Sequence, residues 1–292
     1  MAILSGVLAV GIGVAAVGCG GGQLGTISVY NREDGSGTRS AFLELLELEG
    51  ADLAPSAGEF DATQGVMNAV FKDINGIGYI SLGSVDGTIK AVEVEGVEAS
   101  TENVLSGDYK ISRPFELMYQ EENYEENDLL RDFITFLESA DAQPYISGYG
   151  YISTVSNAPA YVKPTEAFKT TDLTIGGSTS VLPLMATNDG DKICLVEAYK
   201  EACGQNVNIT VSSGGSGVGI TNAGNGTLDI GMASKAVSES DFESPTGTMV
   251  IHQLCMDGIA VIVNTENTIS NLTIAQLQDI YTGKVTSWSE LA

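Results

Sequence analysis

The sequence has few basic residues and almost no histidine or tryptophan. Its 292 residues include 13 Lys and Arg, one His and one Trp, against 38 Asp and Glu, so the formal net charge is −25. Nucleic acids and anionic membrane surfaces are bound through clustered basic residues, and this charge argues against both as partners. A small anion is not excluded, because charges more than about 10 Å away are largely screened at ordinary ionic strength.

Cysteine and histidine are few, and their spacing does not suggest a metal site. Cys194 and Cys203 fall on one predicted helix, roughly 13 Å apart by helix rise, which is too far for a disulfide between them. Neither they nor Cys255 have a Cys/His spacing typical of metal ligands. The sole histidine, His252, precedes an apolar run and is expected at the edge of a core. No His/Asp grouping supplies a nucleophile with a base, so we expect no metal, no cofactor and no enzyme activity.

The N-terminus lacks a run long enough for a confident membrane span. Met1 to Val17 is apolar, short and rich in Gly and Ala. It leads into Ala16-Val-Gly-Cys19 and a glycine tether, which resembles a bacterial lipoprotein cleavage site with Cys19 as the lipidated residue. No Lys or Arg precedes it, so a start further upstream or a merely hydrophobic N-terminus are alternatives. We interpret residues 1–25 as a signal or lipid-anchor segment with its tether.

Glycine and hydroxyl residues, in contrast, gather where predicted strands meet predicted helices. The first such junction is Ile27-Ser-Val-Tyr-Asn-Arg-Glu-Asp-Gly-Ser-Gly-Thr-Arg39. Backbone N–H groups, the Ser36 and Thr38 hydroxyls and the positive end of a helix dipole converge there, and Arg32 adds a planar fork of donors. The junction predicts a cradle for an oxyanion. A capped helix entry with a salt-bridged surface arginine is the alternative.

Two similar junctions occur in the second half of the chain. Gly176-Gly-Ser-Thr-Ser180 follows a predicted strand at 173–175, and Ser212-Ser-Gly-Gly-Ser-Gly217 follows another at 207–211. Ligands of open α/β sheets bind outside the carboxyl ends of strands, so three such loops suggest one shared ligand. An ordinary turn with an N-cap is the alternative for each loop. No Gly-Lys-Ser/Thr follows any of them, which argues against a nucleotide P-loop.

The rest of the pattern predicts an α/β architecture with mostly parallel sheets. The expected elements are helices over 65–75 and 129–139, strands over 77–80 and 89–94, an extended segment over 113–119, a polar loop over 96–108 and a linker over 158–171.

Taken together, these motifs resemble the phosphate-binding proteins of bacterial phosphate ABC transporters. The resemblance covers the chain from residue 26 onward. It rests on Arg32-Glu-Asp-Gly-Ser-Gly-Thr38, Gly177-Ser-Thr-Ser180, Gly214-Gly-Ser-Gly217, Asp229-Ile-Gly-Met-Ala-Ser234, Asp257-Gly-Ile-Ala-Val-Ile-Val-Asn264, and Ile280-Tyr-Thr-Gly-Lys284 with Trp288. It implies a two-lobe, periplasmic-binding-protein-like α/β fold with a ligand cleft between the lobes.

The resemblance also implies the ligand set. Phosphate would be bound by Arg32, Ser36, Gly37, Thr38, Thr179, Ser180 and Ser216. Ser234 stands where some members place a phosphate-facing aspartate, so the acceptor of the phosphate proton is open. Asp34 and Asp229 are further candidates for the acceptor, but we expect Asp34 to orient Arg32 and Asp229 to cap its turn.

The order of the motifs differs from that of the family, whose members begin with the Gly-Ser-Thr motif. The chain therefore resembles a circular permutation, or else a slice of a longer tandem protein. Permutation predicts a split lobe of residues 26–112 plus 257–292 that carries Arg32, and a continuous lobe of 113–256. Because the ends would meet where the family chain is unbroken, Trp288 and Ile27 should lie near one another.

The implied function is high-affinity binding of inorganic phosphate outside the cytoplasm. The protein would be a monomer, attached to the bacterial cell membrane only through its lipid anchor, and would deliver phosphate to the permease subunits of an ABC importer. A binder of sulfate, molybdate or tungstate, or a non-transport surface protein of the same fold, are the alternatives.

Overall fold

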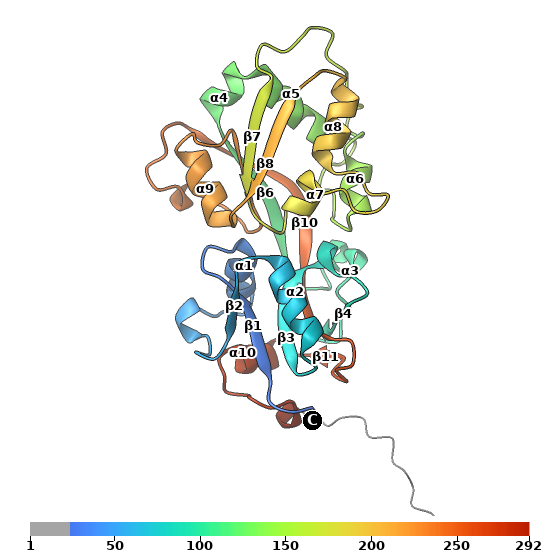
Figure 1. The fold of residues 1–292 in the computed structure, drawn as a ribbon, viewed down its shortest axis with the longest axis vertical. Coiled ribbons are helices and arrows are strands. Elements are labelled where there is room, and N and C mark those ends of the chain that lie inside the picture. The colour runs from blue at the N-terminus through green and yellow to red at the C-terminus, as the bar shows by residue number, and fades with distance from the viewer. Residues whose placement is uncertain (1–23, 292) are drawn as a thin grey trace, which may run out of the picture.

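The chain forms two bodies stacked end to end and joined by long strands (Figure 1). The structure, a computed structural model, describes residues 24–291. Cys19 and nearly all of the predicted anchor segment therefore lie outside the described residues. Each body has its own hydrophobic core. We call them the arginine lobe, with core residues from Ile27 to Ile111 and from Ile259 to Trp288 together with Ile152, and the serine lobe, whose other core residues run from Phe115 to Cys255.

The arginine lobe carries short strands between helices. Its strands are β1 (Ser28–Arg32), β2 (Gly58–Phe60), β3 (Gly76–Ser81) and β4 (Ile89–Ala91), and a small separate sheet joins β5 (Glu93–Val94) to β11 (Asn271–Leu272). Its helices are α1 (Gly37–Leu45), α2 (Thr63–Lys72), α3 (Thr101–Ser106) and α10 (Ile274–Tyr281), with 3-10 turns at Gly50–Asp52, Leu82–Ser84 and Trp288–Leu291.

The serine lobe is richer in helices. Its strands are β6 (Ser112–Gln120), β7 (Asp172–Gly177), β8 (Asn208–Ser213) and β9 (Ile230–Ala233). Its helices are α4 (Glu121–Glu126), α5 (Asp128–Leu137), α6 (Gln143–Gly148), α7 (Leu182–Ala186), α8 (Leu195–Cys203) and α9 (Ser216–Gly224), with a 3-10 turn at Glu239–Asp241.

One long strand, β10 (Met249–Asn264), belongs to both lobes. Its first part pairs with β6 and its last part with β3 and β4, in each case antiparallel. The resulting sheet has the order β2-β1-β3-β10-β6-β9-β7-β8. The remaining strand, β4, lies outside this order and pairs with β10. The prediction of mostly parallel sheets is confirmed only in part: β1, β7 and β11 pair in parallel with their neighbours, whereas every pairing of β10 and β6 is antiparallel. Hydrophobic periodicity carries no information on strand direction.

Helix α5 shows why the apolar pattern predicted helices well. Asn127 caps its first turn by accepting a hydrogen bond from Leu130 N at 3.1 Å. Six of its apolar side chains are buried in the serine-lobe core, from Leu129 to Leu137. Burying a Leu, Ile or Phe side chain stabilises the fold by roughly 1.5–3 kcal/mol. The helix predicted over 129–139 is confirmed, although it begins one residue earlier and ends two residues earlier than predicted.

Other boundaries differ from the prediction for local reasons. The segment 96–108 was predicted as a loop, but it contains α3, which Ser100 caps and Gly107 ends with a left-handed φ of +78°. The strand predicted over 89–94 is two short strands in separate sheets. Residues 158–171 contain no regular element, as expected for a linker.

The entry to β1 lies beside the C-terminal turn. Ile27 N donates to Thr286 O at 2.8 Å, and Trp288 N donates to Gly25 O at 3.2 Å. The expected proximity of Trp288 and Ile27 is confirmed. Permutation itself stays a prediction, because neighbouring ends are compatible with other chain orders.

The cysteines behave as the spacing predicted. Cys194 precedes α8 and Cys203 ends it, and both, like Cys255, are buried free thiols. Across residues 24–291 we find no helix with both the length and the apolar character needed to cross a bilayer.

Candidate functional site

The loop between β1 and α1 forms one side of the site. Gly35 has a φ of +87°, a left-handed conformation that glycine adopts without strain. The chain then enters α1 at Gly37. Ser36 caps this helix, since its Oγ accepts from Arg39 N at 3.4 Å. The Ser36 hydroxyl therefore has the capping role that the alternative interpretation gave it, while it remains buried on the loop that faces the serine lobe.

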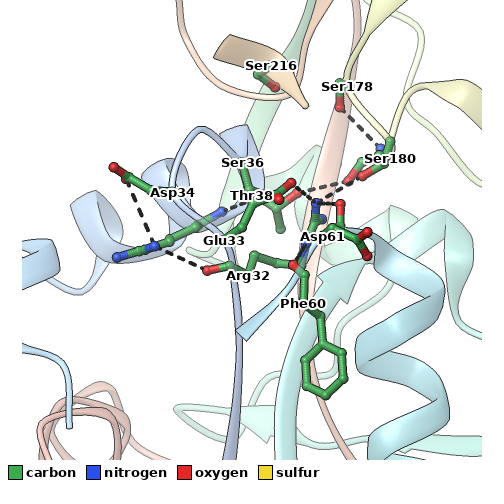
Figure 2. Close-up of polar contacts among 12 residues, drawn as sticks. Arg32, Glu33, Asp34, Ser36, Thr38, Phe60, Asp61, Ser178, Ser180 and Ser216 are labelled. Carbon is green, nitrogen blue, oxygen red and sulfur yellow. Dashed lines mark hydrogen bonds and ion pairs between the residues drawn. The ribbon is translucent and has the colours of Figure 1, made fainter. Parts of the chain in front are cut away.

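Arg32 lies at the end of β1 and is only 2% exposed (Figure 2). Its Nε donates to Phe60 O at 3.1 Å, and its Nη2 donates to Asp61 O at 3.0 Å and to Thr179 Oγ1 at 3.1 Å. Burial lowers the pKa of Arg32, but the ordinary pKa of arginine is so high that the guanidinium stays charged. A buried cation of the arginine lobe thus contacts a hydroxyl of the serine lobe.

The carboxylates beside Arg32 are not arranged as expected. Asp34 is fully exposed, and its Oδ1 lies 3.9 Å from Arg39 Nη1. The nearer carboxylate is that of Glu33, whose Oε1 lies 3.8 Å from Arg32 Nη2. The prediction that Asp34 orients Arg32 was therefore wrong, because the turn at Gly35 carries Asp34 outward, towards α1 (Figure 2).

Hydroxyl groups from three loops of the serine lobe form the other side. Ser178, Thr179 and Ser180 follow β7, Ser216 begins α9, and Ser234 follows β9. Ser178 Oγ donates to Ser234 Oγ at 2.9 Å, and Ser234 N donates to Ser216 Oγ at 3.1 Å. Sequence reasoning missed Ser178, although it stands in the same Gly-Ser-Thr-Ser motif as two predicted residues.

The two sides meet through direct hydrogen bonds. Thr38 Oγ1 and Ser180 Oγ are 2.8 Å apart, and Gly217 N donates to Gly35 O at 3.0 Å. All four of these residues lie on the predicted loops, so the three junctions do converge. This convergence places the charged fork, the hydroxyls and the start of two helices at one boundary between the lobes.

Gly37 is a position where the two lobes approach closely. A Cβ at this position would lie 2.9 Å from Ser234 Oγ and closer still to Ser216 Oγ. Real Cβ atoms do not approach other atoms so closely, so only glycine fits between these two hydroxyls.

The predicted residues therefore form three groups at the boundary, with Ser36 capping the helix behind them. The groups are Arg32 with Thr179, Thr38 with Ser180, and Gly37 with Ser216 and Ser234. That they bind phosphate stays a prediction.

A small open pocket of about 190 Å³ adjoins the third group. Its lining includes Gly37, Ser216 and Gly217, together with Lys235 and Asp241, which form an ion pair. Arg32 does not line this pocket, but along the boundary as a whole hydroxyls, backbone N–H groups and a buried guanidinium are the donors that an oxyanion requires. No group of three His, Cys, Asp or Glu that could hold a metal is found in residues 24–291.

Within the described residues, the serine and threonine hydroxyls of the candidate site are not hydrogen-bonded to any carboxylate. Asp229 lies elsewhere, where its carboxylate accepts from Thr174 N at 2.7 Å and from Asn123 Nδ2 at 3.0 Å. The prediction that Asp229 caps its own turn was wrong, because its carboxylate bonds to β7 and α4, which are distant in sequence. Ser234 is thus the remaining candidate for an acceptor, since its hydroxyl can both accept and donate.

Comparison with known proteins shows which family shares this architecture. A family described as "PBP superfamily domain" matches residues 7–141 and 162–292. The chain is 37% identical to the "Phosphate-binding protein PstS 2" of Streptococcus agalactiae serotype V, over 97% of this chain and 94% of that protein. It is 36% identical to the protein of the same name from Streptococcus pneumoniae serotype 4, over 91% of this chain and 88% of that protein.

A solved structure agrees with these relatives. The crystal structure of a phosphate ABC transporter phosphate-binding protein from Streptococcus pneumoniae TIGR4 matches with a TM-score of 0.70 and 35% identity, covering 92% of this chain and all of that one. The expected α/β, periplasmic-binding-protein-like fold is confirmed. The chain therefore belongs to the PBP superfamily and, within it, to the PstS-like phosphate-binding proteins, which are solute-binding proteins and not enzymes.

Proposed function

We propose that this chain binds inorganic phosphate with high affinity outside the cytoplasm and delivers it to the permease subunits of an ABC importer. The observation that carries the proposal is the buried Arg32 guanidinium, which donates to Thr179 across the boundary between the lobes. The names of the PstS relatives and of the pneumococcal structure support the choice of ligand.

In this proposal the ligands are those inferred from the sequence: Arg32, Ser36, Gly37, Thr38, Thr179, Ser180, Ser216 and Ser234. A dehydrated oxyanion would accept hydrogen bonds from both lobes. Bonds to charged groups contribute about 1.5–3 kcal/mol each, so a few of them can offset desolvation and leave micromolar affinity or better. The formal charge of −25 does not oppose this, because screening limits the reach of surface carboxylates.

Binding would act by closure. The bonds Thr38–Ser180 and Gly217–Gly35 already join the two lobes, and a ligand that bonds to both sides would stabilise that arrangement further. The strands β6 and β10 supply the connection about which the lobes could move. The permease would recognise the closed form.

The chain ends enter the proposal as well. We infer a lobe of residues 26–112 plus 257–292 and a lobe of 113–256, in a circularly permuted order, and the two separate cores and the Trp288–Gly25 bond support this. Residues 26–292 produced alone should melt cooperatively, and phosphate should raise the melting temperature. A chain that aggregates and recovers only in a longer form would favour the tandem alternative.

The location at the membrane is a separate part of the proposal. A lipid on Cys19 would hold the monomer at the outer face of the cell membrane. Cys19→Ala should release the protein from the membrane fraction. A variant that stays membrane-bound would exclude this anchor.

The experiment that tests the function is calorimetric titration with phosphate, sulfate and molybdate. Phosphate keeps a proton near neutral pH and can donate it to an acceptor such as the Ser234 hydroxyl, whereas sulfate has no proton to donate, so the hydroxyl must turn and donate to it instead. A buried polar group left unpaired costs about 1–3 kcal/mol, and a hydroxyl that turns to donate avoids part of this cost, so we expect a preference for phosphate of less than about tenfold. Displacement of half the bound phosphate by an equal concentration of sulfate would leave a general oxyanion binder, and no binding of any anion would favour a non-transport surface protein.

A further inference from the structure

A buried ion pair lies where the chain passes between the lobes. Arg113, near the start of β6, stands opposite Asp257 of β10 in the antiparallel ladder. Its Nε and Nη2 lie 3.3 and 3.0 Å from Asp257 Oδ2, and neither residue is more than 2% exposed. Neither residue belongs to the predicted ligand set.

Ser234 connects the ion pair to the site. The third nitrogen of the guanidinium, Nη1, donates to Ser234 O at 3.0 Å. The N–H of Ser234 donates to Ser216 Oγ, and its hydroxyl accepts from Ser178. Arg113 therefore holds, from the opposite side, the residue on which the serine-lobe hydroxyls converge.

Stability alone explains this pair poorly. Burying two charges costs about as much free energy as their attraction returns, and apolar replacements of similar volume are often equally stable. Asp257 Oδ1 is buried and makes no well-aligned hydrogen bond among the described residues, although the Ser81 hydroxyl and the Gly83 N–H lie close enough to favour its charged form. A role for the Arg113 charge in binding accounts for a buried pair that contributes little to stability.

We propose that Arg113, held by Asp257, is a positioning residue of the oxyanion site, which fixes Ser234 from behind and supplies a second positive charge without touching the ligand. The inference rests on the proposed phosphate-binding function.

The charge of Arg113 acts on Arg32. After burial, which is the main cause, Arg113 is the positive group that lowers the pKa of Arg32 further. Two cations that repel one another in a buried region are both stabilised by an anion bound beside Arg32. Arg113 would thus raise the affinity for an anion without using a hydrogen bond to it.

The test compares variants by titration with inorganic phosphate and by thermal melting. Arg113→Met combined with Asp257→Leu removes both charges and leaves no unpaired ion, so the protein should fold with a melting temperature close to that of the parent. We expect phosphate to bind at least tenfold more weakly. Tyr109→Phe is the control, because it removes a 2.8 Å hydrogen bond to Ile259 O on the same strand without contacting the site, and its affinity should stay within twofold.

Asp257→Asn separates a charge effect from a merely structural one. It keeps an acceptor for Arg113 and removes a negative charge, so phosphate should bind equally well or several-fold more tightly. A purely structural ion pair predicts weaker binding in this variant as well, and that result would overturn the proposal. So would a folded double variant that binds phosphate as its parent does.

A third variant keeps the test decisive if the double variant does not fold. Arg113→Lys retains the charge and loses the fork that bridges Asp257 and Ser234, so we expect phosphate affinity to fall several-fold, and unchanged affinity would overturn the proposal. If the parent protein itself does not bind phosphate, the proposed function fails and this inference fails with it. If the parent binds phosphate and the variants bind it with unchanged affinity, the proposed function stands and only the role of Arg113 is refuted.

Discussion

The two lobes use the same backbone device with different chemistry. In the arginine lobe Gly35 leads into α1, and in the serine lobe Gly215 leads into α9, each with a φ of +87°. Behind the first turn stands the buried Arg32, whereas the second turn is followed by the neutral hydroxyl of Ser216. In the proposed function, the arginine lobe would therefore supply the charge that contacts phosphate, and the serine lobe would supply further hydroxyls that orient it.

The largest expected effect is the loss of that charge. Arg32→Gln should weaken phosphate binding at least tenfold, because charge-assisted hydrogen bonds contribute about 1.5–3 kcal/mol each. Titration calorimetry measures the change, and a melting curve checks that the fold is intact. Arg131→Gln is the matched control, since Arg131 lies on α5 and donates to Tyr124 O, away from the site. Parent-like affinity in Arg32→Gln would show that the cradle is assigned wrongly.

The next effect concerns the approach of the lobes to one another. Gly37→Ala places a methyl group against Ser216 and Ser234, so the closed arrangement should be disfavoured and phosphate should bind about tenfold more weakly, which corresponds to about 1.4 kcal/mol. Small-angle scattering with phosphate present should report a larger radius of gyration than for the parent. Gly87→Ala, where a Cβ meets nothing within 4 Å, should change neither quantity.

A smaller effect is expected for a single hydroxyl of the serine lobe. Ser216→Ala removes one neutral hydrogen bond, worth about 0.5–1.5 kcal/mol, so the affinity should fall between about twofold and tenfold. The exposed Ser56→Ala serves as the control. If Ser216→Ala cost more affinity than Arg32→Gln, the division of roles between the lobes would be refuted.

The smallest effect is on stability where the lobes join. Burial raises the pKa of Asp257 to about 6, against the opposing charge of Arg113. The folded chain therefore holds the Asp257 proton more tightly than the unfolded chain does. The contribution of this group to stability is complete below its ordinary pKa of 3.8 and is lost as the pH rises through about 6.

Melting curves at pH 4 and pH 7 measure this contribution. Between these pH values the melting temperature of the parent should fall more, or rise less, than that of Asp257→Asn. A difference of ~2–4 °C is what about 1 kcal/mol causes in a domain of 150–250 residues. Parallel changes in the two proteins would show that Asp257 does not titrate in this range.

Local features of the site could be predicted from the sequence, and features that depend on the fold could not. Gly35, Arg32 and the hydroxyl motifs were found because a strand, a tight turn and a helix start leave marks in adjacent residues. The outward turn of Asp34 and the antiparallel course of β10 depend on distant partners.

The pairing of Arg113 with Asp257 shows this limit most clearly. These residues are far apart in sequence and meet only because β6 and β10 are neighbours in the sheet. Each stands within a motif or an extended segment that was recognised, but nothing near either residue indicates a buried partner.

The shared strand β10 also constrains the order in which the protein can fold. Ile77 of β3 pairs with Val263, and almost two-thirds of the chain lies between them. At synthesis rates of about 5–20 residues per second, the first strands of the arginine lobe wait on the order of ten seconds or more for their partner. The strands β6 to β9 of the serine lobe are all synthesised before β10, so this lobe can begin to form while the earlier part of the chain is still unfolded.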